Sequence, residues 1–370
     1  MNPRPPRHGV VVTGLDVLSA CGRGPDALSD AVFSGAAAFG PVTRFDTDRR
    51  TVRDAAQLPG APDLGEELLR VISAAFGAAG ITDDVAGRTP VLLALHADAR
   101  THGLAAQVAS VYEVENVYTC ACVAASTAVA DAAARISLGR CERIVVAAGY
   151  LVEPDTFAVF DAGRALARDG RARPFNPGRG GLLLGDAVAA VVLEAESAAQ
   201  DRGAPVLARI PGWARTGDAY HVCRPIPDGS GLGRAIGCAL ERAGLRPEQL
   251  GYVNANATGA PLADGAETAA LRAVLGTHLG RVPISSTKSV HGHALEASAL
   301  LELIVAILAV RTGRLPVNAG YLGPEDSAVI PAEPALNLVL DPGGSTTSPY
   351  ALSLNSAFGG ANTALLVEAV

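Results

Sequence analysis

The chain has 370 residues, of which 49% are hydrophobic and 18% charged, and its formal net charge is −7. This length and apolar content suffice for two ordinary domains or one large duplicated one. The acidic balance, with no basic cluster longer than Arg49-Arg50, provides no electrostatic surface for nucleic acid or an anionic membrane. We expect small molecules or carrier proteins as partners.

The start of the chain, MNPRPPRHG, is polar and proline-rich, so it lacks the apolar core of a secretory signal. No run reaches the ~18 apolar residues of a membrane span. These features predict a cytoplasmic protein without a membrane association. No metal site is expected, because ligand spacing is absent from His8, His96, His102, His221 and His278.

The predicted elements alternate between strands and helices. Strands are expected at HGVVVTGL, RIVVAAG, AVAAVVLE, GYVNAN and TALLVEA, which are short apolar segments rich in β-branched residues. Helices are expected from Glu66 to Ala79, from Val123 to Leu138 and from Leu295 to Val310. This alternation indicates the α/β class.

An internal repeat divides the chain. RGGLLLGDAVAAVVLEAE (179–196) and LNSAFGGANTALLVEAV (354–370) each place a glycine-containing turn before an apolar strand that ends in glutamate. A helix of small residues lies about 60 residues before each of these segments. Reactive side chains stand at its start, Cys122 in one case and Lys288 to His293 in the other. We therefore predict two homologous halves, residues 1–200 and 201–370, joined near Arg202 to Pro211.

Two cysteines precede the first of these helices, in VYTCACVAAS. The free N–H groups and dipole of a helix start stabilise a thiolate, which predicts a low-pKa thiol at Cys122, the better placed of the two. On these residues alone, a small buried side chain at a crowded helix start is the alternative. Without a dense disulfide pattern or paired zinc spacing, most cysteines are expected to be reduced and buried: Cys21, Cys120, Cys122, Cys141, Cys223 and Cys238.

Six segments follow one another along nearly the whole chain: VVVTGLDVLSACGRGPDALSDAVFSGAAAFGPVTRFD, TCACVAAS, RPFNPGRGGLLLGDAVAAVVLE, NANATGAPLADGAE, STKSVHGHALEASALLE and SAFGGAN. In this order they resemble the N-terminal strand, nucleophile turn, central hairpin, histidine-glycine-threonine turn, lysine-histidine segment and glycine-rich loop of the β-ketoacyl synthases of the thiolase superfamily. The resemblance implies a duplicated thiolase fold with five layers, α-β-α-β-α.

The resemblance also implies roles for individual residues. Cys122 matches the nucleophile that accepts an acyl group from a thioester, and Cys120 lies at a flanking position. His293 matches the family's second histidine and Lys288 the lysine that organises the charge around it. Phe358 falls where a backbone N–H forms an oxyanion hole with that of Cys122. Substrates would arrive on the phosphopantetheine of an acyl carrier protein or on coenzyme A, with no bound cofactor.

The sequence departs from the family pattern at several of these positions. Asn256 stands where the first histidine should be, and an asparagine donates a hydrogen bond but carries no charge and relays no proton. This exchange predicts weak decarboxylation of a malonyl thioester. Thr258 retains one of two hydroxyls that bind the pantetheine arm, whereas the second position is Ala260. Ser356 and Ala357 replace the phenylalanine and glycine of a gate.

Further family positions are expected to be structural. Asp264 and Glu267 should brace a turn, Glu302 should be tied to the backbone or to an arginine, and His291 should lie at the surface or line the pocket. Between VLLALHA and VYTCACV the chain is shorter than the family by about 40 residues, a region that supplies the subunit interface and the wall of the acyl tunnel.

Two functions remain open at this point. One is a ketosynthase-like enzyme of polyketide or fatty-acid-type biosynthesis that loads acyl groups on Cys122 for condensation or acyl transfer. The other is a non-catalytic, chain-length-factor-like subunit that pairs with a complete ketosynthase, as Asn256, Ala260 and the shortened region suggest. A thiolase activity is disfavoured, because STKS and GH are ketosynthase-like. In either case we expect a homodimer or heterodimer with an interface at Glu115 to Tyr118.

Overall fold

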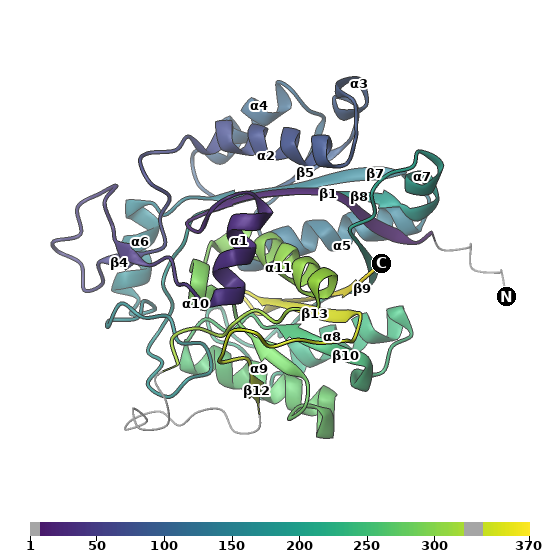
Figure 1. Ribbon diagram of the computed structural model, residues 1–370. Helices are drawn as coiled ribbons and strands as arrows, with labels where there is room; N and C mark the ends of the chain where they lie inside the picture. The colour runs from purple at the N-terminus through teal and green to yellow at the C-terminus, as the bar shows by residue number, and fades with distance from the viewer. Residues whose placement is uncertain (1–7, 322–335) are drawn as a thin grey trace.

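The computed structural model of the protein describes residues 8–321 and 336–370 (Figure 1). In the first half, the elements are β1 Val10–Ser19, β2 Gly22–Arg23, α1 Gly24–Ser34, β3 Gly40–Pro41, β4 Asp54–Ala55, α2 Leu64–Ala78, α3 Asp83–Ala86, β5 Val91–Leu95, α4 Thr101–Ala109, β6 Val114–Tyr118, the 3₁₀ turn η1 Ala121–Val123, α5 Ala124–Ser137, β7 Arg143–Tyr150, α6 Pro154–Ala162, β8 Ala187–Ala195 and α7 Glu196–Asp201.

The second half continues with β9 Ala208–Gly217, α8 Ser230–Ala243, η2 Pro247–Gln249, β10 Leu250–Asn254, α9 Pro261–Leu275, η3 Gly276–His278, β11 Pro283–Ser285, α10 Lys288–His291, η4 Leu295–Ala297, α11 Ser298–Thr312, β12 Asn337–Leu338, β13 Tyr350–Ser356 and β14 Ala361–Glu368. The five expected strands and three expected helices are all present, with bounds shifted by a few residues. One shift has a clear cause, because the Asp63 side chain accepts a hydrogen bond from the Glu66 N–H and starts α2 earlier.

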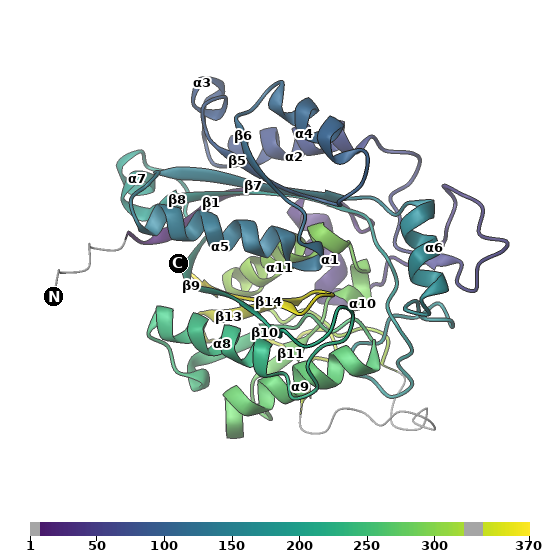
Figure 2. The ribbon, with the colours of Figure 1, turned by 180° about the vertical axis from the view of Figure 1, so that it is seen from behind.

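Five layers are stacked as the sequence predicts (Figures 1 and 2). Helices α2 and α4 cover β1, β5, β7 and β8; α5 and α11 lie in the middle; β9, β10, β13 and β14 follow, with α8 and α9 outside. The middle position explains the composition of α11, SALLELIVAILAVRT, which is apolar on every side and buried almost throughout. The alanine-rich α5 packs against it, since small side chains allow close approach of two helices.

The strands of the two expected β layers are joined into one continuous hydrogen-bonded network. Its order is β12-β11-β10-β13-β14-β9-β1-β8-β7-β5-β6, and the two halves join where Val11 and Val12 of β1 pair with β9. The same pairing occurs in both halves, since β7 runs parallel to β5 and antiparallel to β8, as β13 does to β10 and β14. The boundary near Arg202 to Pro211 stays a prediction.

Strand β6 lies at one end of this network, and its Glu115 and Asn116 are exposed. Only the short helix α4 lies between β5 and β6 in the chain, in the region that is predicted to be shorter than in the family. The edge of β6 is therefore uncovered by any other described strand.

The cysteines correct one expectation. All six are free thiols, but only Cys122 is buried, whereas Cys223 and Cys238 are exposed. Cys238 lies on the outer face of α8, whose buried face is formed by residues such as Ala235, Ile236 and Ala239. Within the two described ranges, no helix is long and apolar enough to cross a membrane.

Candidate active site

A sharp turn between β6 and α5 presents Cys122. Its 3₁₀ turn begins at Ala121, whose φ of 54° lies in the left-handed region that a residue with a Cβ seldom adopts. Helix α5 begins only at Ala124, so Cys122 lies in the turn before the helix rather than inside it. The first N–H groups of a helical turn have no acceptor inside it, so the Cys122 N–H is a candidate donor to a substrate oxygen.

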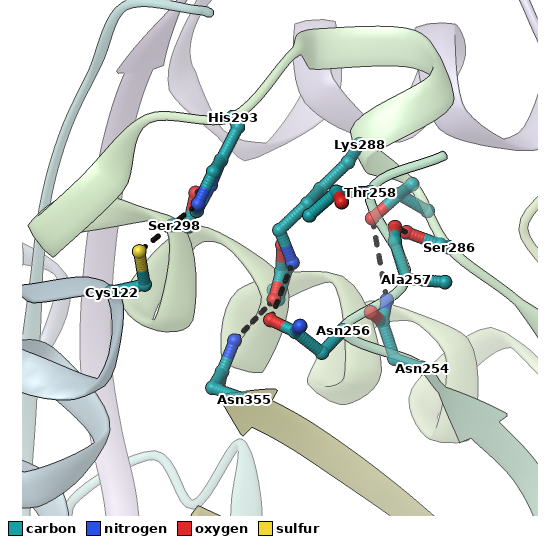
Figure 3. Close-up of polar contacts among 12 residues, drawn as sticks. Cys122, Asn254, Asn256, Ala257, Thr258, Ser286, Lys288, His293, Ser298 and Asn355 are labelled. Atoms are coloured by element: carbon teal, nitrogen blue, oxygen red, sulfur yellow. Dashed lines mark hydrogen bonds and ion pairs between the residues drawn. The ribbon is translucent and has the colours of Figure 1, made fainter. Parts of the chain in front are cut away.

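His293 meets Cys122 from the other half of the chain, with its Nε2 3.1 Å from the Cys122 Sγ (Figure 3). Its backbone is fixed by hydrogen bonds to the segment before β8, because its N–H donates to Leu183 and its carbonyl accepts from Gly185. The preceding Gly292 has φ 74°, and a Cβ there would lie 2.7 Å from the Leu184 carbonyl oxygen. The glycine of the GH pair is therefore required for this close approach.

Ser298, the first residue of α11, holds the other side of the imidazole. Its Oγ lies 2.8 Å from His293 Nδ1 and accepts a hydrogen bond from the Ala294 N–H. Burial, with the charge of Lys288 adding to it, keeps the pKa of His293 well below its usual range, so the ring is neutral. A neutral ring that accepts the Cys122 proton at Nε2 carries its own proton on Nδ1, which then donates to Ser298.

The prediction of a low-pKa thiol at Cys122 is wrong. Burial, followed by the negative charge of Glu296, raises the pKa of the Cys122 thiol to about 12, and Lys288 offsets only part of this. The favourable N–H groups at the helix start are outweighed because the sulfur is removed from water. The resting pair is therefore a neutral thiol beside a neutral imidazole.

Lys288 and Glu302 form a buried ion pair, with 2.5 Å between Nζ and Oε1. Figure 3 shows the Lys288 side chain beside Asn256. The Asn355 amide donates to the second oxygen of Glu302 at 2.6 Å, and Lys288 Nζ donates to the Asn256 Oδ1 at 3.4 Å. Glu302 therefore binds a lysine and an asparagine, and the prediction that it binds the backbone or an arginine is wrong. Since Oδ1 of Asn256 faces Lys288, its Nδ2 is left as the donor for a pocket ligand.

The turn that carries Asn256 is braced as the sequence predicts. The Asn256 N–H donates to Glu267 Oε1, and the N–H groups of Thr258 and Gly259 donate to Asp264 Oδ1. Burial raises the pKa of Asp264 to about 6 and that of Glu267 to about 8, with backbone donors opposing the shift in both. These carboxyl groups are scaffold, because they bind backbone N–H groups of the turn.

One pocket brings together most of the predicted site residues: Cys122, Asn256, Thr258, Ala260, His293, Ser356 and Phe358. Lys288 is the exception, since it is fully buried beside Asn256. The Thr258 hydroxyl accepts from the Ala260 N–H and keeps its own proton for a ligand, whereas the Ser356 hydroxyl donates to Asn362. The polar side of the pocket thus comes mainly from the second half of the chain.

Phe358 lies at the rim of this pocket, with 56% of its surface exposed and its ring stacked on Phe160 at 6.2 Å between centroids. The loop is a tight turn, in which the Gly360 N–H donates to the Ala357 carbonyl and Gly359 has φ 88°. The Phe358 N–H donates to no backbone carbonyl within the described ranges. Its part in an oxyanion hole with Cys122 stays a prediction.

Four further residues correct or extend the sequence analysis. His291 is completely buried between the Gly292 carbonyl and the Thr287 hydroxyl, so the surface or pocket-lining position is wrong. Sequence reasoning missed Ser298, although a serine before an apolar run is a helix-start signal. It also missed the pairing of His96 with Glu296, which no local pattern indicates. No group of side chains suited to a metal exists among residues 8–321 and 336–370.

Both halves match family descriptions: "Beta-ketoacyl synthase, N-terminal domain" over residues 97–199 and "Beta-ketoacyl synthase, C-terminal domain" over residues 207–321. A fold of two α/β halves with a cysteine turn facing a histidine defines a protein of the thiolase superfamily. More closely, the chain belongs to the β-ketoacyl synthase family.

Individual relatives agree with this assignment. The chain is 27% identical to 3-oxoacyl-[acyl-carrier-protein] synthase 2 of Synechocystis over 96% of its length and 97% of that relative. It is 37% identical to nodulation protein E of Rhizobium leguminosarum over 58% of its length, an alignment that spans only 53% of that protein. The solved structure of the ishigamide ketosynthase/chain length factor superposes with a TM-score of 0.86, at 25% identity and covering 98% of this chain and all of that one.

Proposed function

We propose that the protein is a ketosynthase-like acyltransferase of fatty-acid or polyketide-type natural product biosynthesis, in which Cys122 carries the acyl group. The observation that carries this proposal is the 3.1 Å contact between Cys122 Sγ and His293 Nε2 within an open pocket. A nucleophile within hydrogen-bond reach of a base, itself oriented by Ser298, is the arrangement that thioester exchange needs.

In the acylation step, Cys122 Sγ attacks the thioester carbonyl carbon while the thiol proton passes to His293 Nε2, which is neutral and free to accept it. The carbonyl oxygen becomes an oxyanion beside the N–H groups of Cys122 and Phe358. The bond from carbon to the carrier sulfur then breaks, and His293 returns the proton to the leaving thiolate. The product is an acyl-Cys122 thioester and a free carrier thiol.

The acyl carrier in this proposal is the phosphopantetheine arm of an acyl carrier protein or of coenzyme A. The name of the Synechocystis relative supports a protein carrier, and the Thr258 hydroxyl supplies one polar contact for the arm where Ala260 supplies none. No bound cofactor takes part in the step. A partner of this kind is consistent with a cytoplasmic location.

Asn256 restricts the chemistry that is possible once the acyl group is loaded. In a decarboxylating condensation, the developing enolate oxygen needs strong donors, and here one of them is a neutral amide whose oxygen is held by Lys288. We infer that malonyl decarboxylation is slow and that transfer of the acyl group is the better supported half of the chemistry.

A second candidate is a chain-length-factor-like subunit that pairs with a complete ketosynthase. Asn256 favours it, as does the similarity to the ishigamide ketosynthase/chain length factor. The uncovered edge of β6 offers a place for a second chain, either a copy or a related subunit, because an edge strand presents unpaired N–H and carbonyl groups. The retained Cys122 is the observation against a purely supporting role.

Intact-protein mass spectrometry separates the two functions. We would incubate the protein with acyl thioesters of coenzyme A and of an acyl carrier protein, beside Cys122→Ala and the matched control Cys120→Ala. The proposal predicts one acyl group on the wild type and on Cys120→Ala, and none on Cys122→Ala. An unmodified wild type that co-purifies with a second ketosynthase-like chain would favour the subunit instead.

A further inference from the structure

Glu296 occupies, in the second half, the place that Cys122 occupies in the first. Cys122 is the middle residue of η1 before α5, and Glu296 is the middle residue of η4 before α11. Both turns begin with a left-handed residue that is not glycine, Ala121 at φ 54° and Leu295 at φ 41°. The two turns also pack against each other. The carboxyl group of Glu296 therefore lies in the immediate surroundings of the nucleophile.

His96, the residue after β5, is the hydrogen-bond partner of this carboxyl group. Its Nδ1 lies 3.0 and 3.2 Å from the two oxygens of Glu296. The Glu296 side chain is 4% exposed and that of His96 is 32% exposed. A buried carboxylate is costly unless it is paired, so His96 is what makes Glu296 tolerable beside Cys122. The pair joins residues 200 positions apart.

His96 also lines a second cleft, together with Asp98, Arg100 and Glu153, and Phe160 lines both this cleft and the Cys122 pocket. The hydrogen bond from His96 to Glu296, with smaller help from Asp98, raises the pKa of His96 above its usual value, whereas burial and the charge of Arg100 oppose it. His96 can therefore exchange its proton with solvent in the second cleft, which changes the net charge of the His96–Glu296 pair.

The charged and titratable groups around the pair come from several elements. Among the charges that act on Cys122, Glu296 is the strongest; Lys288 of α10 opposes it, and Glu302 of α11 adds to it weakly. Tyr150 of β7 also faces Glu296, and its pKa is raised by burial and then by that charge, with Asp186 and Glu153 adding to it. No other described group changes the Cys122 thiol as much, apart from burial itself.

Resting on the proposed role of Cys122, we propose that Glu296 and His96 form a restraint on the nucleophile. The ionised Glu296 disfavours the thiolate of Cys122, and protonation of His96 relaxes this effect. Both are positioning residues, because they act on the sulfur through charge and touch no substrate. Thiol reactivity is thereby coupled to the ionic state of the second cleft, which lies outside the acyl pocket.

The two members of the pair predict changes of opposite sign. Glu296→Gln removes the negative charge but keeps the shape, so Cys122 should react faster across the pH range that is measured. His96→Asn removes the compensating positive charge, so Cys122 should react more slowly at low pH, where His96 is protonated. Above the titration of His96, this variant should match the wild type. A loosened structure would instead accelerate both variants.

The test is the rate at which iodoacetamide, an uncharged reagent, alkylates Cys122 from about pH 6 to about pH 9, followed by peptide mass spectrometry. We expect a rise of about tenfold for Glu296→Gln, which corresponds to about one pKa unit of the thiol. His96→Asn should be severalfold slower at the acid end only. Glu248→Gln, which removes an exposed carboxylate paired with Arg246 outside the second cleft, serves as the control and should follow the wild type.

Equal acceleration of both variants, or no change in Glu296→Gln, would overturn the restraint. Acylation of the wild type by a thioester is measured in the same preparations. If acylation is absent, the proposed function fails, while the alkylation profiles still decide whether Glu296 and His96 restrain the thiol.

Discussion

The two sides of the pocket are built on different principles. On one side, Cys122 and His293 are neutral, in direct contact and oriented by hydrogen bonds to Ser298. On the other, Asn256 lies against a buried ion pair of Lys288 and Glu302. The first side can move one proton between two atoms. The second holds fixed charge but presents only an amide to the pocket, so it can orient a substrate oxygen without exchanging a proton.

From this difference we expect loading and decarboxylation to be separable in this protein. Loading needs a nucleophile and a proton acceptor, which Cys122 and His293 supply, and N–H donors, for which the N–H groups of Cys122 and Phe358 are the predicted pair. Decarboxylation needs strong stabilisation of a second oxyanion, which the Asn256 side supplies less well. Substitutions on the two sides should therefore have different effects.

The largest effect is expected for the ion pair. Glu302→Gln leaves Lys288 charged and unpaired in the interior, which should lower the free energy of unfolding by about 3–5 kcal/mol. Urea unfolding with an unchanged m value measures it. Glu248→Gln, which loses only an exposed pair with Arg246, should change little. Equal stabilities of both variants would show that the pair does not hold the Asn256 side.

The Phe358 loop comes next. Gly360 and Gly359 give the loop the features of a type II turn, with Phe358 at the position where proline is favoured. Phe358→Pro therefore keeps the turn but removes the N–H, and acylation of Cys122 should slow by ~10²–10³. Phe358→Ala keeps the N–H and should acylate nearly as the wild type. If both variants behave alike in single-turnover acylation, this N–H is not an oxyanion donor.

A smaller effect is expected for the orientation of the imidazole. Ser298→Ala removes the acceptor of the Nδ1 proton and allows the tautomer that cannot take the Cys122 proton, so acylation should slow by roughly tenfold. Ser298→Thr retains the hydroxyl and should restore most of the rate. The pH profile of acylation distinguishes this from a packing defect. An unaltered rate of acylation in Ser298→Ala would show that Ser298 does not orient the His293 imidazole for the reaction.

The residues of the site were predictable where the signal is local. Three short motifs marked these residues: a cysteine before a small-residue helix, a GH pair before an apolar helix, and a glycine turn before the last strand. The structure places Cys122, His293 and Phe358 around one pocket. Asn256 was identified through the resemblance to the family's histidine-glycine-threonine turn, and the structure shows that Glu267 and Asp264 brace this turn.

The state of these residues was not predictable, because it depends on contacts between distant parts of the chain. The neutral thiol of Cys122 follows from burial and from Glu296, 174 positions later by the difference of the two residue numbers. The partner of Glu302 is a lysine on another element, and nothing in either segment specifies it. Local patterns indicate which groups are present, but the tertiary packing decides their protonation.

The central claim is that this site loads acyl groups better than it decarboxylates malonyl groups. The most direct test measures both rates in one preparation, as acyl-Cys122 by mass spectrometry and as carbon dioxide released from a malonyl carrier thioester, for the wild type and Asn256→His. We predict loading in both proteins, slow carbon dioxide release by the wild type and faster release by Asn256→His. A wild type that releases carbon dioxide as fast as it loads, or that carries no acyl group on Cys122, would contradict the account.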